Sequence, residues 1–142
     1  MFDILYQRRN DMLDILARLT AIQQYAKDIH YTAKGDQFYA VHLLADRVAD
    51  GLDDFSDSIK ETHYLGGGEL PPQSKEVLRL AIAYIPVLTD TRTDLTRLAG
   101  LISSTLEILG EVVIDNRSDN ALMDNIAQDL KLKLGLINRQ VA

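Results

Sequence analysis

Two histidines and three carboxylates in the first half of the chain have the types and spacing of metal ligands. They are His30, His42, Asp46, Asp57 and Glu61. The last four fall in one helical pattern at residues 36–62, where steps of four and eleven residues return to nearly the same helix face. Imidazole nitrogens and carboxylate oxygens together suit Fe(II), Mn(II) or Zn(II). Because anionic oxygens stabilise Fe(III) relative to Fe(II), the set favours a site that oxidises iron.

The four ligands on the predicted helix cannot bind one ion within a single chain. At a rise of about 1.5 Å per residue, Asp46 and Asp57 lie roughly 16 Å apart, whereas metal–ligand bonds are about 2.0–2.5 Å long. The two pairs are nevertheless symmetric about a point between Gly51 and Leu52. An antiparallel copy of the helix would place the histidine-containing pair of one chain opposite the carboxylate pair of the other. We therefore predict a dimer with two identical metal sites, each built from both chains.

Taken alone, the pair His42 and Asp46 or the pair Asp57 and Glu61 is also typical of an ordinary solvated helix face. Metal binding is favoured by the symmetry between the two pairs and by the additional histidine His30. His63 is interpreted as a surface residue because it lies beside a glycine-rich loop. The tyrosines are interpreted as amphipathic packing residues. Tyr31 is the one that could take part in redox chemistry, since it adjoins His30.

Composition indicates one soluble domain spanning residues 1–142. The chain has 46% apolar residues, 6% aromatic residues and no cysteine, which excludes disulfides, thiolate catalysis and cysteine-ligated metals. No basic and apolar leader opens it, and no apolar run reaches the roughly 18 residues of a membrane span. We therefore expect a cytoplasmic protein. The formal charge of −6 and the lack of a lysine cluster at either end predict weak or no DNA binding.

Apolar residues recur at helical spacing in five segments, in the order long, long, short, long, long. The first begins near residues 4–10 and ends at Gly35, and Asp36 is expected to cap the second. Ser118 or Asp119 is expected to cap the last, and Val113 is expected to point inward at the end of the fourth. The other four segments are 36–62, 74–85, 90–114 and 118–141. This order predicts an all-α, ferritin-like four-helix bundle with a short helix in the crossover between the second and third long helices.

The stretch HYTAKGDQFYAVH at residues 30–42, continuing to Asp46, Asp57 and Glu61, resembles the Dps-type mini-ferritins. All five ligand positions match the family's signature, and the helix order extends the resemblance over nearly the whole chain. The resemblance implies a hollow shell of twelve subunits built from twofold dimers, with ferroxidase sites at the twofold interfaces. His30, His42 and Asp46 would come from one subunit and the other two carboxylates from its neighbour.

Similar proteins oxidise Fe(II), typically with hydrogen peroxide and alternatively with O2, and store the ferric product. The resemblance therefore implies a mono-iron or di-iron site, which Zn(II) or Mn(II) could also occupy. Tyr31 stands where the family usually has tryptophan. Ala121 replaces a carboxylate of the family's iron-entry pore, which leaves Asp115, Asp119 and Asp124 as candidates there.

Two other classes of function stay open at this stage. One is a protein that coats or compacts DNA with little catalysis, and the other is a helical-bundle interaction protein whose ligand-like residues are incidental. Large ferritins are disfavoured because the Glu-x-x-His motif of their metal sites occurs nowhere in the chain.

Overall fold

The computed structural model describes the backbone at residues 2–112 and 114–142 and the side chains at 11–112 and 114–142. Val113, expected to point inward, lies outside the described residues. The described residues form helices and loops without a strand. The helices are α1 (Phe2–Thr32), α2 (Phe38–Ala49), α3 (Leu52–Ser58), the π-helix η1 (Ile59–Leu65), α4 (Ser74–Tyr84), α5 (Thr91–Glu111) and α6 (Arg117–Val141).

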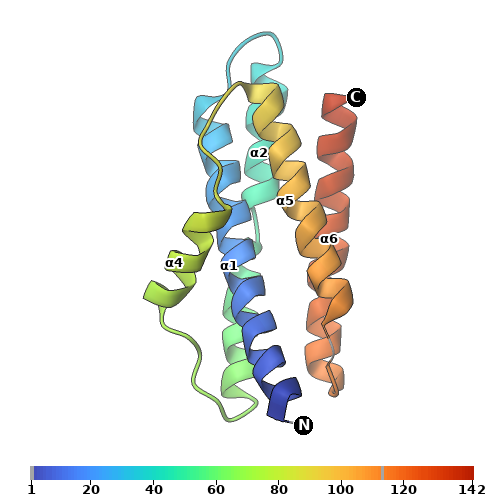
Figure 1. Ribbon diagram of the computed structural model, residues 1–142. Coiled ribbons are helices and arrows are strands. Elements are labelled where there is room, and N and C mark those ends of the chain that lie inside the picture. The colour runs from blue at the N-terminus through green and yellow to red at the C-terminus, as the bar shows by residue number, and fades with distance from the viewer. Residues whose placement is uncertain (1, 113) are drawn as a thin grey trace.

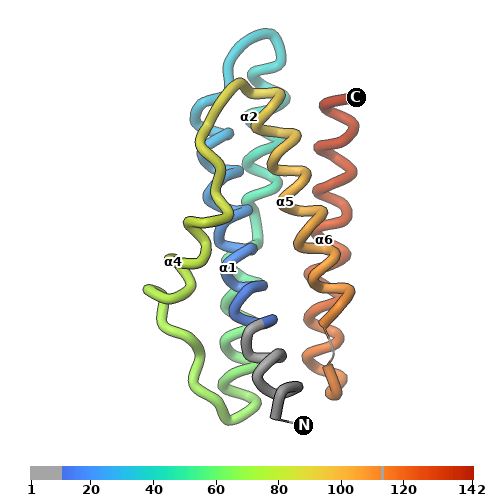
Figure 2. The backbone as a smooth tube through the Cα atoms, viewed as in Figure 1, coloured from blue at the N-terminus to red at the C-terminus, as the bar shows by residue number. Residues whose placement is uncertain are grey.

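Three long helices and a broken fourth make up the bundle. α1, α5 and α6 each run along its length, while α2, α3 and η1 follow one another to form the fourth member (Figure 1). The short helix α4 lies on the outside against α1, within the connection that leads to α5 (Figure 2). The predicted bundle with a short helix in its crossover is therefore confirmed. None of the helices in the described part of the chain is long and apolar enough to cross a membrane.

The core follows from apolar residues spaced three or four apart on each helix. On α1 these residues are almost completely buried, and they form one core cluster with the buried residues of α2, α5 and α6. The α1 set includes Met12, Ile15, Leu19, Ile22 and Ile29. The spacing of the second predicted helix places Phe38 on the same apolar face as Val41. Phe38 is instead partly exposed at the first turn of α2.

The second long helix is not continuous, which differs from the single helix expected at residues 36–62. α2 ends at Ala49, Asp50 is extended with ψ 133°, and Gly51 has φ +81° before α3 begins at Leu52. Glycine occupies this left-handed region without the steric cost that a Cβ would add. The apolar spacing does not reveal this break, because Val48 before it and Leu52 after it are four residues apart and both buried, as they would be in a continuous helix. The two predicted ligand pairs therefore stand on separate helical segments.

Helix α3 passes directly into the π-helix η1, which ends at the loop containing Gly66. The amide of Gly66 donates to the carbonyl oxygen of Glu61 at 2.8 Å, and the amide of Glu69 donates to that of Tyr64 at 2.8 Å. Both bonds join residues five apart, the spacing of a π-helix, which is often found at functional sites. Glu61, one of the predicted ligands, lies within this widened segment.

Side-chain caps define the start of two helices, and one of them differs from expectation. Asp90 accepts a hydrogen bond from the amide of Thr93 at 2.9 Å and caps α5. α6 is capped by Asn116, whose side-chain oxygen accepts from the amide of Asp119 at 2.9 Å, so the expected cap at Ser118 or Asp119 was wrong. The expected cap at Asp36 was also wrong, because Gln37 occupies the N-cap of α2 and makes no side-chain cap bond.

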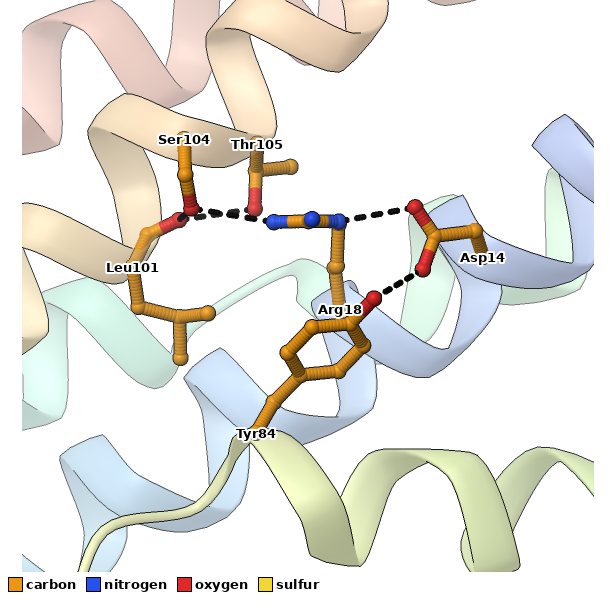
Figure 3. A network of polar contacts seen from close by, with 6 residues as sticks. All are labelled: Asp14, Arg18, Tyr84, Leu101, Ser104 and Thr105. Atoms are coloured by element: carbon orange, nitrogen blue, oxygen red, sulfur yellow. Dashed lines mark hydrogen bonds and ion pairs between the residues drawn. The ribbon is translucent and has the colours of Figure 1, made fainter.

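A polar network fastens the crossover helix α4 to α1 and α5 (Figure 3). The hydroxyl of Tyr84 donates to Oδ1 of Asp14, and the guanidinium of Arg18 donates to Oδ2 of the same carboxylate at 2.9 Å. Arg18 also donates to Oγ of Ser104 at 2.9 Å and lies 4.5 Å from the centre of the Tyr84 ring. Burial, together with the hydrogen bond to Asp14, raises the pKa of Tyr84 above its ordinary value of 10.0. The network therefore sets where the crossover lies on the bundle.

Candidate metal centre

The two predicted histidine ligands lie against each other across α1 and α2. The rings of His30 and His42 are stacked, with centroids 3.8 Å apart and planes at 16°. Nδ1 of His30 donates to the carbonyl oxygen of His42 at 2.7 Å, and Nδ1 of His42 donates to the carbonyl oxygen of His30 at 2.8 Å. The pair is half-buried, and its bonds join the end of α1 to the start of α2 across the loop at residues 33–37.

These reciprocal bonds determine which nitrogen of each ring can bind a metal. A carbonyl oxygen can only accept a hydrogen bond, so Nδ1 of both rings must carry the proton. In the neutral imidazole the lone pair is then on Nε2, the nitrogen left for a ligand. A hydrogen bond from the other ring nitrogen to a backbone carbonyl is the usual way in which proteins orient metal-binding histidines. The two backbone bonds therefore fix both the tautomer and the ring orientation of His30 and His42, and they leave each Nε2 available to a metal.

Two aromatic side chains contact the histidine pair and are open to solvent in the single chain. Phe38 stacks on His42 with centroids 5.3 Å apart, and Tyr31 meets the edge of His30 at 5.0 Å. Tyr31 is 77% exposed, and Tyr39 and Leu43 are exposed as well. Tyr31 therefore contacts His30 through its ring, and its part in redox chemistry stays a prediction.

The three predicted carboxylate ligands are exposed and lie on three different segments: Asp46 on α2, Asp57 on α3 and Glu61 on η1. Asp46 borders a shallow depression shared with Lys27, Asp50 and Asp53. Among the described residues of one chain, no group of three or more His, Cys, Asp or Glu side chains is arranged to hold a metal. The fold thus brings together His30 and His42 and does not complete the five-residue set within one chain.

His63, interpreted from sequence as a surface residue, is in fact half-buried and paired across the bundle. Its Nδ1 lies 2.8 Å from Oδ2 of Asp119 in the first turn of α6, and Asn116 donates to the same oxygen at 3.1 Å. Asp119 is buried and engaged in these contacts, so of the three candidate pore residues only Asp115 and Asp124 remain exposed. The sequence carries no signal for this pair, because 56 residues separate its members.

A second residue that the sequence reasoning missed is Lys133 on α6, which is 2% exposed. Its Nζ donates to the carbonyl oxygen of Asp50 at 2.6 Å and lies 2.7 Å from Oδ2 of Asp129. A signal was present, because Ile126, Leu130, Lys133 and Ile137 follow the spacing of the buried face. A lysine in that stripe indicates a buried partner.

Comparison with known proteins agrees with this architecture. No family model and no curated protein matches the sequence. Among solved structures, the chain is similar to an archaeal Dps homologue from Halobacterium salinarum, with a TM-score of 0.79 and 16% identity over 99% of this chain and 82% of that one. It is also similar to a mutant of Mycobacterium smegmatis Dps1, with a TM-score of 0.74 and 11% identity over 100% and 99% of the two chains. The fold is that of the Dps-type mini-ferritins.

Proposed function

We propose that the protein is an iron-oxidising and iron-storing mini-ferritin. The observation that carries this proposal is the His30–His42 pair, in which each Nδ1 is bound to the other residue's carbonyl and each Nε2 is left as a potential ligand. The mini-ferritin fold supports the same function, and in the sequence resemblance the pair matches two of the family's ligand positions.

The stacking of the two rings favours two metal positions over one. A ligand bond from imidazole lies in the ring plane and is about 2.0–2.1 Å long for a metal such as zinc. With nearly parallel rings whose centroids are 3.8 Å apart, an ion in the plane of one ring lies too far from the plane of the other to bond to both. His30 and His42 would then serve different ions, an arrangement suited to a two-metal site with ions about 3.5–4 Å apart.

In this proposal Asp46 belongs to the same subunit as the histidines, and the last two ligands come from a second subunit. Asp46, Asp57 and Glu61 are exposed in the single chain, and apolar side chains beside the histidines are exposed with them. A twofold contact would cover these apolar side chains and complete the site, with Asp57 and Glu61 supplied by the partner. We propose that such dimers assemble further into a shell of twelve subunits in the cytoplasm.

Iron is the substrate in this proposal, and hydrogen peroxide or O2 is the oxidant. With peroxide, two Fe(II) ions each lose one electron, the O–O bond breaks, and two water molecules complete the product as two FeOOH with release of four protons. Carboxylates favour the reaction because they stabilise Fe(III) and can accept the released protons. Consuming iron and peroxide together suppresses hydroxyl-radical formation.

Light scattering and iron loading test the proposal on the purified protein. A shell of twelve subunits of 15.9 kDa has a mass of about 190 kDa, and it should retain ferric iron after Fe(II) is added with peroxide. The proposal predicts that oxidation is much faster with the protein than in buffer at the same pH. A stable monomer, or oxidation at the buffer rate, would contradict it.

A further inference from the structure

The helical segment that carries Asp57 and Glu61 is fastened to α6 at both of its ends. We call residues 52–65, which comprise α3 and η1, the carboxylate arm. Its start adjoins the break that Lys133 reaches, and its end adjoins the contact between His63 and Asp119. The histidine half of the proposed site is held differently, through the mutual bonds between α1 and α2. The two halves of the site therefore depend on different supports.

Lys133 substitutes for a backbone bond that the break removes. In a continuous helix the carbonyl of Asp50 would accept from the amide of Asp54. Here the amide of Asp54 lies 3.1 Å from Oδ1 of Asp53, and the Asp50 carbonyl accepts instead from the Lys133 ammonium at 2.6 Å. The positive charge also lies at the C-terminal end of α2, where the helix dipole favours a cation. Lys133 thus stabilises the extended conformation at Asp50 that sets the direction of the arm.

The far end of the arm is held by a second polar contact. Nδ1 of His63 lies 2.8 Å from Oδ2 of Asp119, and both side chains are largely buried. His63 follows Glu61 by two residues within the same π-helix. Asn116 donates to the Asp119 carboxylate and also caps α6, so the contact is tied to the start of that helix. A displacement of either end would move Asp57 and Glu61 relative to the partner's histidines.

Burying the ammonium group of Lys133 costs free energy, because the charge loses its hydration. Replacing a whole ion pair such as Lys133–Asp129 by apolar side chains of similar size is often neutral or stabilising, so stability alone gives little reason for a lysine here. We propose that Lys133, together with the His63–Asp119 pair, positions the carboxylate arm for its half of the shared metal site. This inference rests on the function proposed above and deepens it. Lys133 acts through Asp50 and the break, and it is a positioning residue.

The test compares Lys133→Met with Lys131→Met, an exposed lysine on the same helix. Supporting residues around metal sites typically contribute about tenfold to a hundredfold in affinity or activity. Lys133→Met should therefore slow Fe(II) oxidation by at least about tenfold and shift the visible absorption spectrum of bound Co(II). Lys131→Met should match the native protein in both measurements. Equal rates and equal Co(II) spectra for Lys133→Met and the native protein would overturn the inference.

Subunit mixing shows which half of the site is affected. If Lys133 positions only the arm of its own chain, Lys133→Met should regain oxidation when its subunits are exchanged with His42→Gly, whose arm is intact. Exchange with Asp57→Ala should give no recovery, because neither chain then supplies an intact arm. Equal recovery in both mixtures, or recovery in neither despite proven exchange, would indicate a general structural defect and overturn the inference.

His63→Phe provides a second variant should Lys133→Met fail to assemble. It keeps an aromatic ring beside Tyr64, which His63 contacts at 4.7 Å, and removes the nitrogen that meets Asp119. The same pattern of recovery with His42→Gly only is expected, with Thr62→Ala as the exposed neighbouring control. If neither mixture distinguishes His63→Phe from this control, the inference is wrong. If the native protein itself oxidises no iron and binds no Co(II), the proposed function fails and this inference fails with it.

Discussion

His30 and His42 each hold the ring of the other through a backbone carbonyl, at 2.7 and 2.8 Å. The same two residues therefore hold the α1–α2 connection closed and present the two Nε2 nitrogens. Loss of either ring removes a ligand and one of the two bonds, whereas the backbone carbonyl that accepts from the Nδ1 of the remaining ring stays in place. The histidine half of the proposed site is consequently formed within one chain before any partner binds.

The carboxylate half is tested by comparing Asp57→Ala with Asp54→Ala. Both residues are exposed on α3, but only Asp57 belongs to the proposed ligand set. Asp57→Ala should slow Fe(II) oxidation by at least about tenfold, because a directly bound carboxylate is lost. Asp54→Ala should leave the rate nearly unchanged. Stopped-flow absorbance with peroxide gives both rates, circular dichroism checks that helicity is retained, and similar rates for the two variants would count against Asp57 as a ligand.

The break in the second helix is tested at Gly51. Its φ of +81° lies in the left-handed region, where alanine costs about 1–2 kcal/mol even though nothing lies within 4 Å of an added Cβ. Gly51→Ala should therefore lower the free energy of unfolding by about that amount. Gly100→Ala, inside α5 with the same free space, should raise it by about 0.5–1 kcal/mol. Denaturant titration measures both, and a stabilised Gly51→Ala variant would indicate that the helix is continuous in solution.

Alkaline pH should destabilise the bundle through two tyrosines. Burial and the hydrogen bond to Asp94 raise the pKa of Tyr25 above its ordinary value of 10.0, and burial with Asp14 does the same for Tyr84. The folded state then holds these protons more tightly than the unfolded state. The stabilisation is complete below about pH 10 and is lost as pH rises above it. Thermal unfolding followed from about pH 8 to 11 should show this decline, with a shallower slope in Tyr84→Phe; identical slopes would exclude a role for Tyr84.

DNA binding is expected to be weak at neutral pH and physiological salt. Each chain carries a formal charge of −6, so twelve subunits would carry about −72 before any iron enters. Such a shell repels a polyanion. A gel-shift titration with duplex DNA at roughly 0.15 M salt, without divalent metal that could bridge the two, measures this. Retention of DNA at micromolar protein or below would favour a DNA-coating function.

The fold was predictable from sequence because each helix has an apolar face at regular spacing. The bundle and its crossover helix required only that pattern and the glycine and proline residues of the connecting loop. The break at Gly51 could not be predicted from this pattern, since Val48 and Leu52 continue the regular apolar spacing on both sides of it. At the break the carbonyl of Asp50 accepts a hydrogen bond from the ammonium of Lys133, which is 83 residues away.

Sequence spacing also placed His30 and His42 in one candidate site, and the structure brings these two together. Their stacking and mutual bonds depend on how α1 and α2 pack, which residue spacing does not specify. His63 was misjudged for the same kind of reason, because its partner Asp119 belongs to a distant helix. The placement of Asp57 and Glu61 in a neighbouring subunit's site remains a prediction.

Mixing His42→Gly and Asp57→Ala subunits tests the shared site most directly. Each variant alone should oxidise Fe(II) slowly, since every site in it lacks one ligand. After exchange of equal amounts, random pairing gives a complete set at about a quarter of the sites, formed by the histidines of an Asp57→Ala chain and the carboxylates of a His42→Gly chain. We therefore predict recovery of about a quarter of the native rate. No recovery, with exchange proven by mass spectrometry of the mixed particles, would contradict a site built from two chains.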